Sequence, residues 1–217
     1  MLKNQVFING ALLENCYLVW DEDSKEGIIV DPGYVDVEKM GSLIEKEHIH
    51  IKAIVNTHGH RDHVYGNQAV MTLTKAPLII HEADAGYLTD PVYNLSHNYS
   101  NDFTSPVPNQ TIAEGEGDVI KLGNIVLKVI ETPGHTPGSI VIYNEEIALT
   151  GDTLFFGSVG RSDFLGGNKD DMVKSLEKLK KEIPKTAAIL SGHGKVQTTF
   201  GEQLEMNPFL TGQMQPK

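Results

Sequence analysis

Residues 56–66 read NTHGHRDHVYG and place four potential metal ligands within six positions: His58, His60, Asp62 and His63. Zinc in proteins usually takes four ligands in total, so this one segment could almost complete the shell of a single ion. A chain with such a segment must fold so that these side chains converge. The remaining sequence decides whether further ligands join them.

Three further ligand-type residues follow apolar segments that are typical of strands. Residues 125–135 lead to His135, residues 146–152 to Asp152 and residues 187–193 to His193, as residues 53–58 lead to His58. A turn that contains glycine then presents each side chain. Since rigid strand ends often position functional groups, we expect these residues to form one site.

The complete set has seven members, which exceeds the capacity of one zinc ion: His58, His60, Asp62, His63, His135, Asp152 and His193. Two ions can share them if one carboxylate bridges the pair, and a carboxylate has two oxygens for that purpose. The set therefore predicts one ion on His58, His60 and His135 and a second on Asp62, His63 and His193. Asp152 is the predicted bridge. Asp31, which also ends an apolar segment, is expected to orient a ligand histidine through the other ring nitrogen.

Isolated histidines are more often surface or core residues than ligands, and we interpret His48, His50, His81 and His97 in that way. Structural zinc sites are usually closed and rich in cysteine. The candidate ligands include no cysteine, so the set favours a catalytic two-metal site over a structural one.

Composition limits the possible partners. The 217 residues are 40% hydrophobic, which suits a single domain spanning residues 1–217. A formal net charge of −11 argues against nucleic acid, and the N-terminus lacks the apolar run of a signal or membrane segment. The chain has one cysteine, Cys16, which we expect in the core. These features predict a cytoplasmic protein without membrane or nucleic-acid partners, and they specify no oligomeric state.

The pattern also predicts local structure. Residues 5–8, 16–20 and 27–33 are typical of strands, and residues 36–48 and 168–184 of amphipathic helices, the first with Asp36 as N-cap. Residues 86–118 are rich in Pro, Asn, Ser and aromatic residues, and we expect a long ordered loop that forms a wall of the site.

The motifs resemble those of the metallo-β-lactamase superfamily, whose signature is an H-x-H-x-D-H loop followed by later His, Asp and His residues. The resemblance covers nearly the whole chain, from DPG at 31 through THGHRDH, TPGHTPGS and GDTLF to SGHG at 191. It implies an α/β fold, an αββα sandwich of two mixed β-sheets flanked by helices, with the site along one edge of the sheets.

Within the superfamily the chain is most similar to the glyoxalase II branch and its short bacterial relatives, through GDTLFFGSVGRSDF and the segment that begins at SGHG. Asp152 differs from the cysteine or serine typical of true β-lactamases. The helical C-terminal domain of full-length glyoxalase II has no counterpart before Lys217. Gly194 and Lys195 stand where those enzymes tend to have an acidic residue and a tyrosine, so the usual glutathione clamp is not evident.

The resemblance implies a metal-dependent hydrolase that cleaves a small-molecule thioester of the hydroxyacylglutathione type. Two divalent ions, zinc or alternatively iron or manganese, would generate a bridging hydroxide. Asp62 would hold its ion and orient this nucleophile, and Arg161 would bind a substrate carboxylate unless it forms a salt bridge within its loop.

Alternative activities share parts of this site. A persulfide dioxygenase would use one iron on His58, His135 and Asp152, and a lactone hydrolase would use the same two-metal chemistry. A ribonuclease is disfavoured by the charge, and a non-catalytic metal-binding module by the seven-ligand set.

Overall fold

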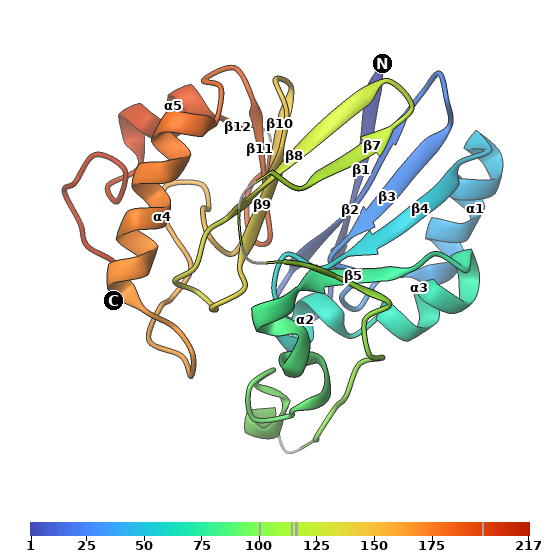
Figure 1. Ribbon diagram of the computed structural model, residues 1–217, viewed down its shortest axis with the longest axis horizontal. Coiled ribbons are helices and arrows are strands. Elements are labelled where there is room, and N and C mark those ends of the chain that lie inside the picture. Colours follow the sequence, from blue (N-terminus) through green and yellow to red (C-terminus); the bar gives the residue numbers. More distant parts are fainter. Residues whose placement is uncertain (100, 114, 116, 197) are drawn as a thin grey trace.

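Two six-stranded sheets lie face to face in the computed structural model of the chain, which describes residues 1–99, 101–113, 115, 117–196 and 198–217 (Figure 1). The first sheet has the order β1 (Leu2–Asn9), β2 (Glu14–Asp21), β3 (Glu26–Val30), β4 (His50–Val55), β5 (Leu78–His81) and β6 (Gln110–Ile112). The second has the order β12 (Thr198–Thr199), β11 (Ala188–Ser191), β10 (Ile147–Gly151), β9 (Ile140–Tyr143), β8 (Ile125–Glu131) and β7 (Val119–Leu122).

Both sheets are mixed. In the first, β1, β2 and β3 pair antiparallel, whereas β3, β4, β5 and β6 pair parallel. In the second, β10 and β11 form a parallel pair among antiparallel neighbours. Parallel strands end at the same edge of a sheet, so the segments that follow them meet there.

Helices cover the outer faces of the two sheets. α1 (Val37–Glu47) and α3 (Asn67–Thr74) lie beside the first sheet, and α4 (Lys169–Glu182) and α5 (Phe200–Met206) beside the second (Figure 1). Three apolar clusters fill the spaces between these layers, one between the sheets and one beneath each helical layer. The predicted αββα sandwich is therefore confirmed.

The two long helices begin where the sequence indicates. The Asp36 side chain accepts a hydrogen bond from the Lys39 backbone N–H, and Asn168 caps α4 by accepting from Asp170 and Asp171. Pro184 follows the last residues of α4. The stripe on α4 that contains Met172, Leu176 and Leu179 is buried against the second sheet. Burial of each such side chain contributes about 1.5–3 kcal/mol. Cys16 is fully buried, as expected.

Residues 86–118, expected to be one long ordered loop, contain regular elements. The segment completes the 3₁₀ helix η1 (Glu82–Thr89), forms a second, η2 (Ser96–Tyr99), and contributes β6 as an edge strand parallel to β5. Residues 100, 114 and 116 of this stretch lie outside the described residues. β6 has three residues, too few for a period-two pattern to reveal it.

The end of β11 is attached to β2 of the opposite sheet. The Tyr17 hydroxyl donates to the Ser191 carbonyl (2.7 Å), and the Asn15 amide donates to the same carbonyl (3.0 Å). A backbone bridge also pairs Glu14 with His193. These contacts fix the position at which the chain leaves β11.

No helix in the described part of the chain is long and apolar enough to cross a bilayer.

We expect Tyr17→Phe to lower the free energy of unfolding by about 1 kcal/mol, because the ring stays buried while the Ser191 carbonyl loses a donor. Urea unfolding followed by circular dichroism would measure this difference. An unchanged midpoint would mean that the hydroxyl contributes nothing to the junction between the sheets.

Candidate metal centre

Seven candidate ligands converge from loops that follow strands of both sheets. His58 follows β4, and His60 precedes the short helix α2 (Arg61–Val64), which carries Asp62 and His63. From the second sheet, His135 follows β8, Asp152 follows β10 and His193 follows β11. All seven side chains predicted from the sequence are therefore brought together; their role as ligands stays a prediction.

Six of the seven form two compact groups. One ligand atom from each of His58, His60 and His135 lies within 4.8 Å of the others, and the same holds for Asp62, His63 and His193. In the first group His60 Nδ1 and His135 Nε2 are 2.9 Å apart. In the second, His63 Nε2 and His193 Nε2 are 3.2 Å apart, and Asp62 Oδ2 is 3.2 Å from His193 Nε2.

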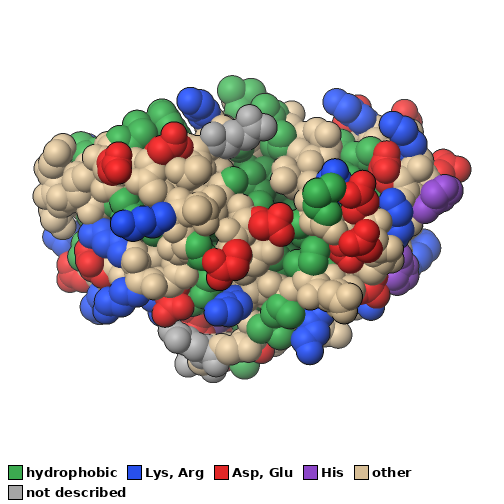
Figure 2. Space-filling view, turned by 90° about the horizontal axis from the view of Figure 1, so that it is seen from above, with side chains coloured by type: hydrophobic (Ala, Val, Ile, Leu, Met, Phe, Trp, Pro, Cys, Tyr) green, Lys and Arg blue, Asp and Glu red, His purple; other side chains and the backbone are tan. Residues whose placement is uncertain are grey.

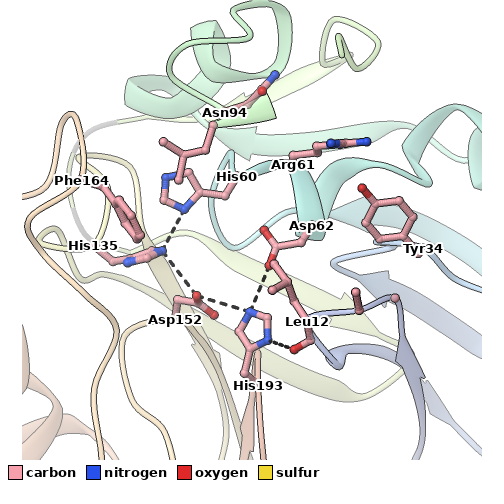
Figure 3. Close-up of a pocket in the computed structure, with 13 residues that line it drawn as sticks. Leu12, Tyr34, His60, Arg61, Asp62, Asn94, His135, Asp152, Phe164 and His193 are labelled. Carbon is pink, nitrogen blue, oxygen red and sulfur yellow. Dashed lines mark hydrogen bonds and ion pairs between the residues drawn. The ribbon is translucent and has the colours of Figure 1, made fainter. Parts of the chain in front are cut away.

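Asp152 lies between the two groups (Figure 3). Its Oδ2 is 3.4 Å from His135 Nε2 in the first group and 3.6 Å from His193 Nε2 in the second. Its Oδ1 is 3.3 Å from His63 Nε2. This single carboxylate contacts both groups, which is the position expected of a bridge.

Hydrogen bonds outside the cluster orient the imidazoles. His135 Nδ1 donates to the Arg161 carbonyl (2.6 Å) and His193 Nδ1 to the Leu12 carbonyl (3.0 Å). A carbonyl can only accept, so Nδ1 carries the proton and the Nε2 lone pair points inward. His63 Nδ1 likewise lies 3.0 Å from Asp31 Oδ2. Such partners fix the tautomer and ring orientation that a metal requires.

Asp31 orients two histidines from one buried position. Besides its contact with His63, its carboxylate accepts from the Thr57 backbone N–H (2.7 Å) and hydroxyl (2.6 Å). The Thr57 oxygen in turn lies 3.1 Å from His58 Nδ1. The expected contact between Asp31 and a histidine is present, and it extends to both groups.

Asp84 joins the two loops that carry the first group. Its Oδ2 accepts from the backbone N–H of Gly59 (2.9 Å), between His58 and His60, and its Oδ1 from that of Gly138 (2.7 Å), three residues beyond His135. A Cβ on Gly138 would lie 2.8 Å from Asp84 Oδ1, so a side chain there would obstruct this approach. Asp84 is fully buried. No pattern in the sequence around it indicated this role.

The protonation of the two groups differs. Burial lowers the pKa of His58 well below its usual value and that of His60 to about 3. Burial opposes protonation of His63 too, but the carboxylates of Asp152, Asp62 and Asp31 raise its pKa well above normal. At His193 burial is again the largest cause and lowers the pKa, but the hydrogen bond that His193 donates to Asp62 and the charges of Asp152 and Asp62 together raise it. His58 and His60 are thus neutral near neutral pH, whereas His63 and His193 hold a proton more readily than a free imidazole.

The donor set fits divalent metal ions. His58 Nε2 and His60 Nε2 are buried and have no hydrogen-bond partner among the described residues. A buried polar atom without a partner is costly, and imidazole nitrogens facing one another at about 3 Å are stabilised by a cation between them. These groups fit divalent metal ions and do not distinguish zinc from iron.

A pocket of about 640 Å³ opens over the cluster. Its residues come from the β1–β2 turn, the loop after β3, α2, the segment after η1 and the loop before α4: Gly10, Ala11, Leu12, Tyr34, His60, Arg61, Asp62, Asn94, Leu95, His135, Asp152, Phe164 and His193. Segment 86–118 contributes Asn94 and Leu95 to the wall, whereas Phe103 packs on Tyr65.

Arg161 forms the salt bridge that the sequence left open as an alternative, and its binding of a substrate carboxylate stays a prediction. Its guanidinium pairs with both Asp163 oxygens (2.8 and 2.9 Å), lies over the Phe164 ring and does not line the described pocket. The backbone carbonyl of Arg161 nevertheless holds His135.

The remaining histidines lie outside the two groups, as expected. His48 ends α1 in a left-handed conformation and His50 is exposed. His81 lies 3.2 Å from Glu131, and His97 lies 2.9 Å from Asp102.

The chain matches a model of the metallo-beta-lactamase superfamily over residues 9–193. It is 31% identical over 205 residues to the probable metallo-hydrolase YqgX of Bacillus subtilis (94% of this chain, 95% of YqgX). It is 30% identical over 203 residues to the hydroxyacylglutathione hydrolase GloC of Haemophilus influenzae (92% and 94%). It is 28% identical over 200 residues to the mitochondrial persulfide dioxygenase ETHE1 of Mus musculus (90% and 70%).

Two solved structures have the same fold as this chain. The B3 metallo-beta-lactamase BLEG-1 has a TM-score of 0.87 and 30% identity, covering 97% of this chain and 100% of that one. TTHA1623, solved in a di-iron-bound form, has a TM-score of 0.77 and 30% identity, covering 95% and 100%.

We expect the two metal ions to respond differently to pH. Protons on His63 and His193 compete with the second ion below their raised pKa values, whereas His58 and His60 have lowered pKa values and are already neutral. As the pH falls from 8 to 6, affinity at the second group should fall steeply and affinity at the first should change little. Calorimetric zinc titrations in two buffers of different ionisation enthalpy would count the protons released. Release of equal numbers of protons on binding of the two ions would contradict this difference in pH dependence.

We expect Asp84→Asn to weaken binding at the first group by about 10–100-fold. The amide keeps one acceptor but presents N–H groups to one of the two backbone donors. Competition with a chromophoric chelator would measure both affinities. The control is Asp36→Asn, since asparagine caps a helix as well as aspartate does. Equal weakening at both groups would show that Asp84 supports the whole centre.

Proposed function

Because the chain belongs to the metallo-β-lactamase superfamily, in which metal-dependent hydrolysis is the general activity, we propose that it hydrolyses thioesters with two divalent metal ions. The further proposal of a hydroxyacylglutathione-type substrate is supported by the likeness to GloC over nearly the full length of both chains.

The observation that carries the proposal is the position of Asp152 between two complete groups of ligands. A single-metal enzyme would need one group and would leave Asp62, His63 and His193 without a purpose. Hydrolysis with two ions uses both groups and a carboxylate that joins them.

The residues have distinct proposed roles. His58, His60 and His135 would hold one ion, Asp62, His63 and His193 the other, and Asp152 both. Bound divalent ions would supply Lewis acidity and a water of lowered pKa.

Asp62 is the proposed catalytic residue. Its side chain lines the pocket, and its Oδ2 is 3.2 Å from His193 Nε2. Burial opposes its ionisation, but His63 and His193 hold its pKa below the usual value, so it remains a carboxylate. As a carboxylate it can accept a hydrogen bond and thereby orient an attacking water.

The apolar part of the pocket would hold the acyl group and exclude bulk water. Leu12 lies on the β1–β2 turn and Phe164 on the loop before α4, and both face the cluster (Figure 3). The Phe164 ring contacts the His60 and His135 rings edge to face at 5.8 and 6.1 Å. A small acyl group next to this ring would lie beside the first group of ligands.

Persulfide dioxygenase is the second candidate, because the chain is 28% identical to ETHE1 and contains His58, His135 and Asp152 in one cluster. Dioxygen chemistry requires a redox-active ion, whereas hydrolysis proceeds with zinc. Lactone hydrolysis would use the same groups as thioester hydrolysis.

We expect the zinc-loaded protein to release thiol from a hydroxyacylglutathione thioester, and neither the zinc nor the iron form to consume dioxygen with glutathione persulfide. Both forms, loaded anaerobically, should be assayed side by side. A lactone and a β-lactam belong in the panel because one structural neighbour is a β-lactamase. Oxygen uptake by the iron form alone, without thioester cleavage by either form, would replace the hydrolase with a dioxygenase.

A further inference from the structure

The pocket extends beyond the ligand cluster to a wall that contains Arg61, Tyr34 and Asn94 (Figure 3). Arg61 is the one lysine or arginine among the described residues that line the pocket. The chain has only two arginines, and the other, Arg161, is paired with Asp163. The positive charge in this wall therefore comes from Arg61.

The backbone of Arg61 is fixed relative to the ligands. It begins α2 between His60 and Asp62, one ligand from each group. Its N–H donates to the Asn94 carbonyl (2.9 Å), which ties α2 to the wall. A side chain anchored here keeps a constant distance from the place where the reaction would occur.

Aromatic rings orient the guanidinium. Its central carbon lies 5.8 Å from the centroid of the Tyr34 ring and 5.5 Å from that of Tyr65, and these two rings stack at 4.2 Å. At these distances the positive charge is attracted to the faces of both rings. A planar guanidinium is a side chain that can bind a carboxylate through two parallel hydrogen bonds.

The net negative charge of the molecule makes a local cation important for binding an acidic substrate. A formal net charge of −11 repels anions at long range, although acidic and basic side chains are interspersed on the face that Figure 2 shows. An acidic substrate would need a local positive group to bind in one orientation. Arg61 supplies it at the wall, apart from the ligand cluster.

We propose that Arg61 is the specificity-determining residue that binds a carboxylate of the substrate, remote from the bond that is cleaved. The substrates are then thioesters that carry an acidic group. This inference rests on the proposed hydrolase function for the reaction, but the binding step can be measured without it.

The expected signature lies in binding and not in the chemical step. A contact to a remote carboxylate is made equally in the ground state and the transition state, so its loss raises KM and leaves kcat nearly unchanged. A charge-assisted pair is worth roughly 10–100-fold in affinity.

The test compares matched ligands that differ only in charge. Kinetics would use the benzoyl thioesters of 3-mercaptopropanoate and 3-mercaptopropanamide. Equilibrium binding would use the uncleavable thioethers 3-(benzylthio)propanoate and 3-(benzylthio)propanamide, with both zinc-loaded and metal-free protein. The metal-free arm separates Arg61 from direct binding of the carboxylate to zinc.

We expect the wild-type protein to bind the carboxylate about 10–100-fold more tightly than the amide in both forms. Arg61→Gln should abolish this preference, and Arg61→Lys should retain part of it, because lysine keeps the charge without the fork. Arg61→Glu should instead favour 3-(benzylthio)propylamine, a reversal that loss of folding cannot produce.

The control variant is Arg161→Gln, which should keep the preference for the carboxylate ligand. A preference that survives Arg61→Gln, or that disappears with Arg161→Gln, would overturn the assignment. The two proposals fail separately. A carboxylate preference without thioester cleavage would refute the hydrolase and retain Arg61 as the anion-binding residue, whereas cleavage without the preference would do the reverse.

Discussion

Five imidazoles and two carboxylates, four of the seven side chains buried, lie close together at the base of the pocket, with ring nitrogens of neighbouring histidines facing one another at about 3 Å. Lone pairs at this distance repel unless a proton or a metal ion lies between them. A small number of contacts with the surrounding structure hold the rings in this arrangement. Carbonyl groups receive the outer protons of His135 and His193, and Asp31 holds His58 and His63 in place. The fold is thus organised around a centre that requires cations.

The sandwich supplies these contacts because each ligand group draws on both sheets. His58 and His60 come from the first sheet and His135 from the second, and Asp84 connects their loops. Tyr17 of the first sheet holds the end of β11, from which His193 follows. A shift of one sheet against the other would therefore separate ligands within each group, so the packing between the sheets and the geometry of the centre depend on each other.

Much of this arrangement could be predicted from the sequence. The ligand motif and the apolar segments before His135, Asp152 and His193 predicted convergence, because strand ends in layered sheets meet at one edge. Asp36 was predicted as the N-cap of α1, and residue 168 as the start of the helix that contains α4. The three-residue strand β6 was missed because its pattern is too short. For Arg161 the sequence left two alternatives open, and the structure shows that its guanidinium pairs with Asp163.

Asp84, Tyr34 and Arg61 show a different limit. Asp84 acts through contacts with residues 25 and 54 positions away, which no local pattern encodes. Arg61 lies inside the ligand motif, and nothing in the sequence distinguishes its side chain from that of an ordinary surface arginine. Its position on the pocket wall became visible only when the fold placed the Tyr34 ring beside it. Specificity is harder to predict than metal binding because it depends on such neighbours.

Two ions in one chain, joined by Asp152, are the proposed arrangement, and the metal stoichiometry distinguishes it from a single-ion site. Native mass spectrometry of zinc-saturated protein, with Asp152→Ala and His193→Ala in parallel, would resolve the ions bound to each chain. We expect two ions for the wild-type chain, weakened retention of both in Asp152→Ala, and one ion retained in His193→Ala. A plateau at one ion in the wild-type chain, or loss of a single ion in Asp152→Ala, would contradict the proposed bridge.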